Sequence, residues 1–254
     1  MPRVSAFRTL WAALVGLYEE TLVLLVGNIA ALALNVPIGL VLFVLITLAS
    51  VVLGLPLIGG GDEGGATWLP VTIAWLLTLM PTPGNVALAG LTRVAAGPDA
   101  PRFAVFRTTL RAHWSLALRC SLVSLSVLLA LVGNVLFYAS VGGWLRFASI
   151  LWLYATLFWL SLHIYLAPLL VHVAEPRLLN LYRRAAFIAL GHPWYSMLLL
   201  LILLGVGLLT VVFLPAYVLI GAAFISLVQA HALREIRRRH GDLLEAPVDE
   251  VGRL

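Results

Sequence analysis

The sequence predicts an all-α, polytopic membrane helix bundle with six transmembrane spans and three interfacial amphipathic helices on the cytoplasmic side. The 254-residue chain is 62% hydrophobic and only 11% charged, which is too apolar for a soluble domain. Several apolar stretches reach the roughly 20 residues that a spanning helix needs. All sixteen basic residues are arginines, and most lie in short polar segments between the apolar stretches: the first ten residues, 91–111, 177–184 and 234–239.

The chain begins with a predicted amphipathic helix at 5–18, whose apolar side chains recur at helical spacing. The uncharged stretch 21–58 could form one long span kinked at Pro37, or a hairpin of two spans. A hairpin would place Asp62 and Glu63 inside the cell and the next group of arginines outside. That arrangement violates the positive-inside rule, so we predict a single long first span.

The second span is predicted at 68–93 and contains the segment Pro81-Thr82-Pro83-Gly84-Asn85. Two prolines and a glycine must interrupt the helix and leave carbonyls of the preceding turn without their helical donors. Irregular backbone at membrane depth persists only where protein or water satisfies it, and Thr82 and Asn85 are the local candidates. In transporters such breaks line substrate sites, whereas elsewhere a proline–glycine kink only shapes the helix. Both interpretations remain open.

In the rest of the chain, the sequence predicts two more interfacial helices, at 101–113 and 175–191. The four further spans are predicted at 114–138, 145–172, 194–213 and 216–232. Six spans place both termini in the cytoplasm, with 233–254 as a cytoplasmic tail of one 1–254 membrane domain.

This layout suggests three repeated units, 1–95, 101–172 and 175–232, each with an interfacial helix followed by two spans. If the repeat is real, its units are parallel repeats about an axis along the membrane normal. The alternative is ordinary anchoring, because arginine and tryptophan commonly mark a cytoplasmic membrane boundary.

Motifs that would indicate an enzyme, a metal site or a cofactor are missing from the sequence. It has no His-Glu-x-x-His helix, no Gly-x-Ser-x-Gly elbow and no phosphate-binding loop with lysine. No Asp or Glu falls inside a predicted span, which argues against a proton-coupled or sodium-coupled carrier. The single cysteine, Cys120, cannot form an internal disulfide. We therefore expect a non-enzymatic protein without a cofactor or bound metal.

Uncharged polar residues inside the spans are the remaining candidates for chemistry. A histidine in a membrane is costly unless it is paired, so His163 either lines a polar cavity or bonds a neighbouring helix. Intramembrane amides usually join helices by hydrogen bonds. The candidate residues of a polar cavity are Asn28, Asn35, Thr82, Asn85, Asn134, His163 and Gln229.

The arginines of the second and third amphipathic segments form a separate candidate site. A net charge of +5 would suggest nucleic acid for a soluble protein, but arginines at the ends of spans favour the anionic membrane surface instead. We therefore expect membrane lipids as partners and no nucleic acid. The candidate residues for anionic headgroups or a cytoplasmic partner are Arg102, Arg107, Arg111, Arg177, Arg183 and Arg184.

The chain resembles the YesL-like family of bacterial integral membrane proteins. The resemblance rests on three segments: Leu79-Met80-Pro81-Thr82-Pro83-Gly84-Asn85-Val86-Ala87-Leu88; Phe103 and Phe106-Arg107 with Trp114; and Arg183-Arg184-Ala185-Ala186 with Leu190-Gly191-His192-Pro193. It covers most of 70–232, while the long first span and the loop 59–67 depart from the family. The resemblance implies an accessory protein of the plasma membrane, linked to solute transport and carbohydrate uptake, with a membrane transporter as its partner. The alternative function is a small-solute channel or carrier with its site at the broken second span.

Overall fold

A computed structural model describes residues 5–53, 65–141, 143–173, 177–212 and 217–240, and these residues are almost entirely helical. The expectation of an all-α chain is confirmed for them. The helices are α1 (Ala6–Glu19), α2 (Thr21–Leu53), α3 (Gly65–Leu79), α4 (Pro83–Ala95), α5 (Phe103–Ser140), η1 (Gly143–Phe147), α6 (Ala148–His172), α7 (Leu178–Gly191), α8 (Pro193–Val212), η2 (Tyr217–Gly221) and α10 (Ala222–His240). The acidic loop with Asp62 and Glu63 lies outside the described residues.

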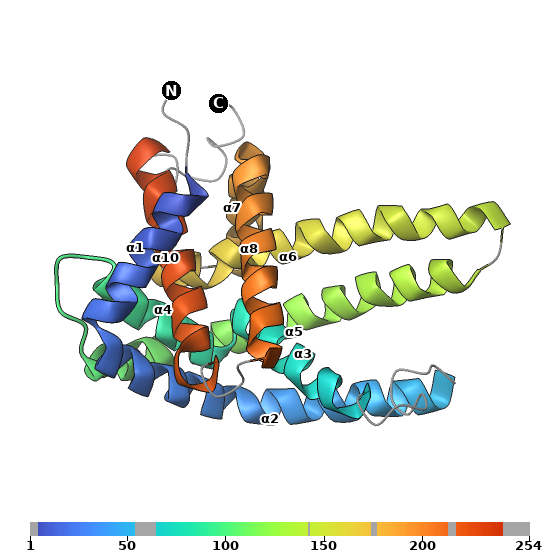
Figure 1. Cartoon of the computed structure of the whole chain (residues 1–254), viewed down its shortest axis with the longest axis horizontal. Helices are drawn as coiled ribbons and strands as arrows, with labels where there is room; N and C mark the ends of the chain where they lie inside the picture. The colour runs from blue at the N-terminus through green and yellow to red at the C-terminus, as the bar shows by residue number, and fades with distance from the viewer. Residues whose placement is uncertain (1–4, 54–64, 142, 174–176, 213–216, 241–254) are drawn as a thin grey trace.

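The helices run in two main directions (Figure 1). Helices α2, α5 and α6 follow the long axis of the molecule, and α5 and α6 form a hairpin that extends away from the other helices. Helices α1, α8 and α10 run across that axis. Large apolar side chains along α2 and α5 are exposed, including Leu22, Leu40 and Leu122. Exposed apolar surface of this extent is expected where lipid covers the protein.

Among the residues that the structure describes, four helices are long and apolar enough to cross a membrane, and a fifth candidate results if α7 and α8 are counted together. The four are Thr21–Leu48 in α2, the whole of α5, η1 together with α6, and Leu219–Arg238 in η2 and α10. The predicted number of six spans is therefore not confirmed. Helices α3 and α4 are each too short to qualify because the break at residues 80–82 divides the predicted second span.

The amphipathic segments take three different forms. Helix α1 is separate from α2, and α7 meets α8 at an angle of 102° just before Pro193. The segment 101–113, in contrast, is no separate interfacial helix, because α5 runs without a break from Phe103 to Ser140. The sequence around Trp114 contains neither proline nor glycine, so nothing in the backbone ends the helix there. The second of the three predicted units therefore lacks a detached first helix.

The C-terminal helix extends beyond its predicted end. It begins after a π-helical turn, η2, and α10 then continues to His240. Leu233 and Ile236 are buried against the rest of the protein, which explains why the helix does not end at residue 232. Residues 233–236 thus pack against the bundle, and 241–254 lie outside the described residues.

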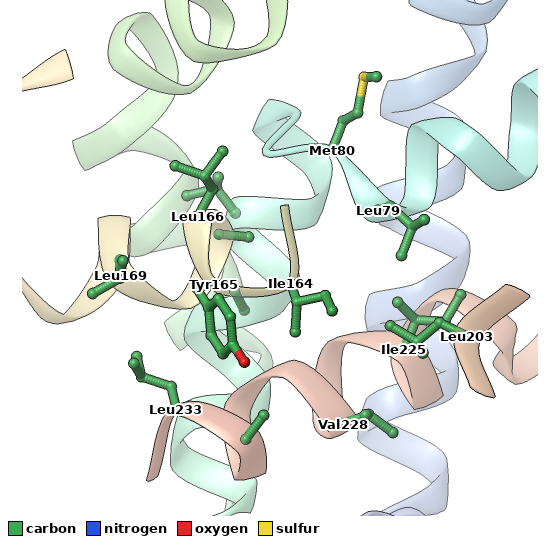
Figure 2. Packing of buried hydrophobic residues seen from close by; sticks show 14 of the residues in the cluster. Leu79, Met80, Ile164, Tyr165, Leu166, Leu169, Leu203, Ile225, Val228 and Leu233 are labelled. Carbon is green, nitrogen blue, oxygen red and sulfur yellow. The ribbon is translucent and has the colours of Figure 1, made fainter. Parts of the chain in front are cut away.

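The central core lies where the broken span, α6, α8 and α10 meet (Figure 2). Leu79 is the last residue of α3, Met80 lies in the break, Leu203 comes from α8 and Val228 from α10. Figure 2 also shows Ile164, Tyr165, Leu166 and Leu169 of α6 and Ile225 and Leu233 of α10. The break is therefore enclosed by apolar side chains, and its backbone polar groups need partners within the protein.

Candidate functional site

The predicted break in the helix near Pro81 is confirmed, and Thr82 caps the helix that follows it. Helix α3 ends at Leu79 and α4 starts at Pro83. Thr82 is the N-cap of α4, and its side-chain oxygen accepts a hydrogen bond from the backbone N–H of Asn85 at 3.2 Å. Threonine is a favoured N-cap residue, and proline is tolerated in the first helical turn because its missing N–H would have no partner there.

The carboxamide of Asn85 joins the two ends of the break. Its Nδ2 donates to the carbonyl oxygens of Leu77 (2.6 Å) and Met80 (2.8 Å). In a regular helix the carbonyl of Leu77 would also accept from residue 81, which is a proline without an N–H. Asn85 supplies that missing donor. Its Oδ1 accepts a hydrogen bond from Nδ2 of Asn35 in α2 at 3.0 Å, so two of the predicted cavity residues meet at the break.

Two neighbours complete this site, and neither stands out from the sequence as a member of it. The Ser121 hydroxyl of α5 shares its one hydrogen between the carbonyl oxygens of Ala117 in its own helix (2.9 Å) and of Pro81 (3.1 Å). Gly84 packs directly against α2, where a Cβ atom at residue 84 would lie 2.6 Å from the carbonyl oxygen of Ala31. The sequence does not reveal either contact, because the partner in each case lies on a helix far away along the chain.

Two other predicted cavity residues lie away from the break. Asn28 is fully buried, and its Oδ1 accepts from the backbone N–H of Ala223 at the start of α10 (2.7 Å). Asn134 is only half-buried, and its Nδ2 donates to the carbonyl oxygen of Ala130 in its own helix (2.7 Å). Asn28 therefore connects α2 with α10, whereas the bond of Asn134 stays within α5.

His163 and Gln229 form a third contact, between α6 and α10. Nε2 of Gln229 donates to the backbone carbonyl oxygen of His163 at 3.3 Å. The ring atom Nδ1 of His163 is 2.8 Å from the carbonyl oxygen of Trp159, and it must carry the hydrogen because a carbonyl can only accept. Nε2 of His163 and Oδ1 of Asn35 are both buried without a further hydrogen-bond donor among the described residues. The seven predicted residues thus occupy several places in the fold rather than one cavity.

An aromatic contact between α5, α6 and α7 was not anticipated from the sequence. The rings of Trp159 and Tyr182 stack with their centroids 5.4 Å apart. The Tyr182 hydroxyl donates to the carbonyl oxygen of Cys120 (2.9 Å), so the hydroxyl of Ser124 must donate to Tyr182 (2.7 Å). Trp159 Nε1 donates to the carbonyl oxygen of Ser124. This contact fixes α7 against the hairpin.

The predicted arginine site is a surface feature. Five of its arginines are exposed, and Arg184 is half-buried. Those of α5 lie at its beginning, and the others lie in or directly before α7. Both groups are in the part of the molecule away from the α5–α6 tip (Figure 1). The six residues are Arg102, Arg107, Arg111, Arg177, Arg183 and Arg184.

Within the described residues, His, Cys, Asp and Glu side chains form no group of three that could hold a metal ion. No protein-family model, curated protein or solved structure matches the chain. The resemblance to the YesL-like family therefore stays a prediction from the sequence.

Proposed function

We propose that this chain is a non-enzymatic protein of the plasma membrane that assists solute transport by binding anionic lipid headgroups and a membrane partner through its arginine surface. Both termini then lie in the cytoplasm. The single observation that carries the proposal is the exposure of Arg102, Arg107, Arg111, Arg177 and Arg183 beside long apolar helices. Each arginine close to an anionic membrane surface contributes about 1 kcal/mol to the free energy of binding the headgroups. The link to carbohydrate uptake rests on the YesL-like resemblance alone.

The bonding at the break supports a structural role for it within this proposal. Asn85 has both Nδ2 hydrogens on backbone carbonyls and its Oδ1 on Asn35. Thr82 is engaged with the backbone of the next turn and is fully buried. These groups already serve the protein's own backbone, so a passing solute would have to compete with the contacts that hold α3 to α4.

The proposal is tested by changing all six arginines to glutamine in the full-length protein. We expect the purified variant to retain much less phosphatidylglycerol, measured by mass spectrometry after mild detergent extraction, while its helical content is unchanged. Arg146→Gln is the matched control, because Arg146 lies in η1 between α5 and α6, remote from the arginine surface. Equal lipid retention in the wild type and the sixfold variant would contradict the proposal.

The rival function is a small-solute channel or carrier with its site at the broken span. The observation that favours it is that Oδ1 of Asn35 and Nε2 of His163 are buried and accept no hydrogen bond from the described residues. A solute with hydroxyl groups could donate to such acceptors. Solute uptake into proteoliposomes that is lost in both Asn35→Ala and His163→Ala, but retained in Asn134→Ala, would favour the carrier over the accessory role.

A further inference from the structure

A row of polar side chains lies along the unbroken helix α5. An interfacial helix that ended at residue 113 would separate Arg111 from Arg119 by a turn of the chain. In the structure α5 runs without interruption, so Arg111, Ser115 and Arg119 follow one another at intervals of four residues on one helix. Side chains four residues apart in a helix are neighbours on its surface. The three side chains therefore form a single row.

This row faces away from the rest of the protein. All three of its side chains are exposed. The opposite face of α5 packs against the bundle, since Ala117, Cys120 and Ser121 are buried there. Helix α5 contains no acidic residue, so no neighbour on the same helix neutralises the two guanidinium groups. The row thus presents two positive charges and a hydroxyl group to the surroundings.

Arg119 is the last charged residue of α5, and it marks a boundary on the helix. The segment 120–140 is uncharged and, at 1.5 Å per residue, is roughly 30 Å long. The hydrocarbon core of a bilayer has about the same thickness. Leu122, Leu129 and Phe137 continue the face of the row through this segment, and all three are exposed. A bilayer around the segment would therefore place Arg119 at the level of the headgroups.

The surroundings of Arg119 fit a phospholipid better than a free anion. Exposed apolar side chains adjoin it, with Leu118 beside it and Leu122 less than one turn further along, and acyl chains can cover them. Arg111 and Arg119 are about 12 Å apart along the helix axis, so their long side chains can both reach a group held over Ser115. Guanidinium groups match phosphate oxygens through paired N–H donors.

We propose that Arg111, Ser115 and Arg119 bind the phosphate of one anionic phospholipid, whose acyl chains lie along the exposed apolar face of α5. The two guanidinium groups and the Ser115 hydroxyl donate to the phosphate oxygens. A zwitterionic lipid is disfavoured, because its own cation would lie close to the two arginines. The site rests on the proposed function in one respect, since Arg111 belongs to the arginine surface, whereas Ser115 and Arg119 do not.

The test uses the full-length protein in mild detergent and titrates phosphatidylglycerol against phosphatidylcholine, with the bound lipids counted by native mass spectrometry. We expect the wild type to hold one phosphatidylglycerol more tightly than all others. In Arg119→Gln the apparent affinity for this molecule should fall about fivefold, the loss expected for one arginine at an anionic membrane surface. Ser115→Ala should weaken it as well, and the control Arg146→Gln should keep the wild-type affinity.

A further variant separates this site from the rest of the arginine surface. It keeps the row on α5 and carries glutamine in place of the five other arginines of that surface, and it should still hold the tight lipid. If it loses that lipid, or if Arg119→Gln holds it as the wild type does, the site does not exist. The proposed function is then still decided separately, by the sixfold variant. If inorganic phosphate displaces the tight lipid, the row binds a free anion and the assignment to a lipid is wrong.

Discussion

A single side chain, that of Asn85, satisfies two backbone carbonyls at the break between α3 and α4. Its amide offers two donors and one acceptor, and these meet the carbonyls of Leu77 and Met80 and the amide of Asn35. An aspartate would have no donor for the two carbonyls and would bury a charge. The geometry of the break therefore depends on an amide at this residue.

Asn85→Ala is expected to lower the free energy of unfolding by about 2 kcal/mol, because it removes three bonds and leaves buried groups without partners. Thermal unfolding in neutral detergent measures the change. The matched control is Asn134→Ala, which removes a half-buried amide bonded to its own helix. Similar losses in the two variants would show that the break does not depend on Asn85.

Gly84→Ala is expected to destabilise the protein by about 1–3 kcal/mol, because the new Cβ would lie 2.6 Å from the carbonyl oxygen of Ala31 and force α2 and α4 apart. The control is Gly133→Ala, where a Cβ would meet nothing within 4 Å. That control should be neutral or stabilising by up to about 1 kcal/mol, since alanine favours a helix. A Gly84→Ala variant as stable as the control would rule out the close approach of the two helices.

The sequence predicts this residue-scale chemistry only in part. The prolines fix the break, and they make Thr82 and Asn85 its nearest polar groups, with Asn35 as one of several polar residues of the predicted spans that could meet them. The choice between those partners depends on which helices pack together, and single-sequence patterns do not contain that information. Asn134 illustrates the limit, since nothing in its local sequence distinguishes an amide that faces another helix from one that does not.

At the scale of helices, boundaries marked by proline are predicted well and the others poorly. Pro83 and Pro193 each begin a helix close to the expected place. The segment 101–113 looks like a separate amphipathic helix, yet α5 continues through it. A polar face that ends part-way along a helix does not interrupt the backbone hydrogen bonds, whereas a proline would. The sequence also predicts too early an end for the last helix. The charged residues after 232 suggest a polar tail, although the apolar residues between them are buried.

Tyr182→Phe tests the contact that holds α7 to α5. The variant keeps the aromatic ring that stacks on Trp159 but loses the hydroxyl that bonds Cys120 and Ser124. We expect a loss of about 1–2 kcal/mol in the free energy of unfolding, measured by thermal unfolding in detergent. Tyr154→Phe is the control, because the Tyr154 side chain is 66% exposed. A loss of equal size in the control would exclude a specific contribution from the Tyr182 hydroxyl.

At the scale of the whole molecule, composition predicts the class of protein but not the number of spans. Apolar length identifies the helices that could cross a membrane, whereas their direction depends on packing. Helices α8 and α10 run across the axis followed by α2, α5 and α6 (Figure 1), and no hydropathy pattern contains that crossing. The predicted orientation is the most testable prediction at this scale, because it rests on where most of the arginines lie rather than on any one helix.

The proposed orientation is tested most directly by finding out from which side of the membrane each end of the α5–α6 hairpin can be labelled. Single cysteines are introduced at Ala104, at the beginning of α5, and at Trp144, in η1, in a variant in which Cys120 is replaced by alanine. Both side chains are exposed in the structure. We predict that an impermeant maleimide added to intact cells labels the cysteine at residue 144 and reaches the one at residue 104 only after the cells are opened. Labelling of residue 104 from outside, or of both residues from the same side, would contradict the proposed orientation.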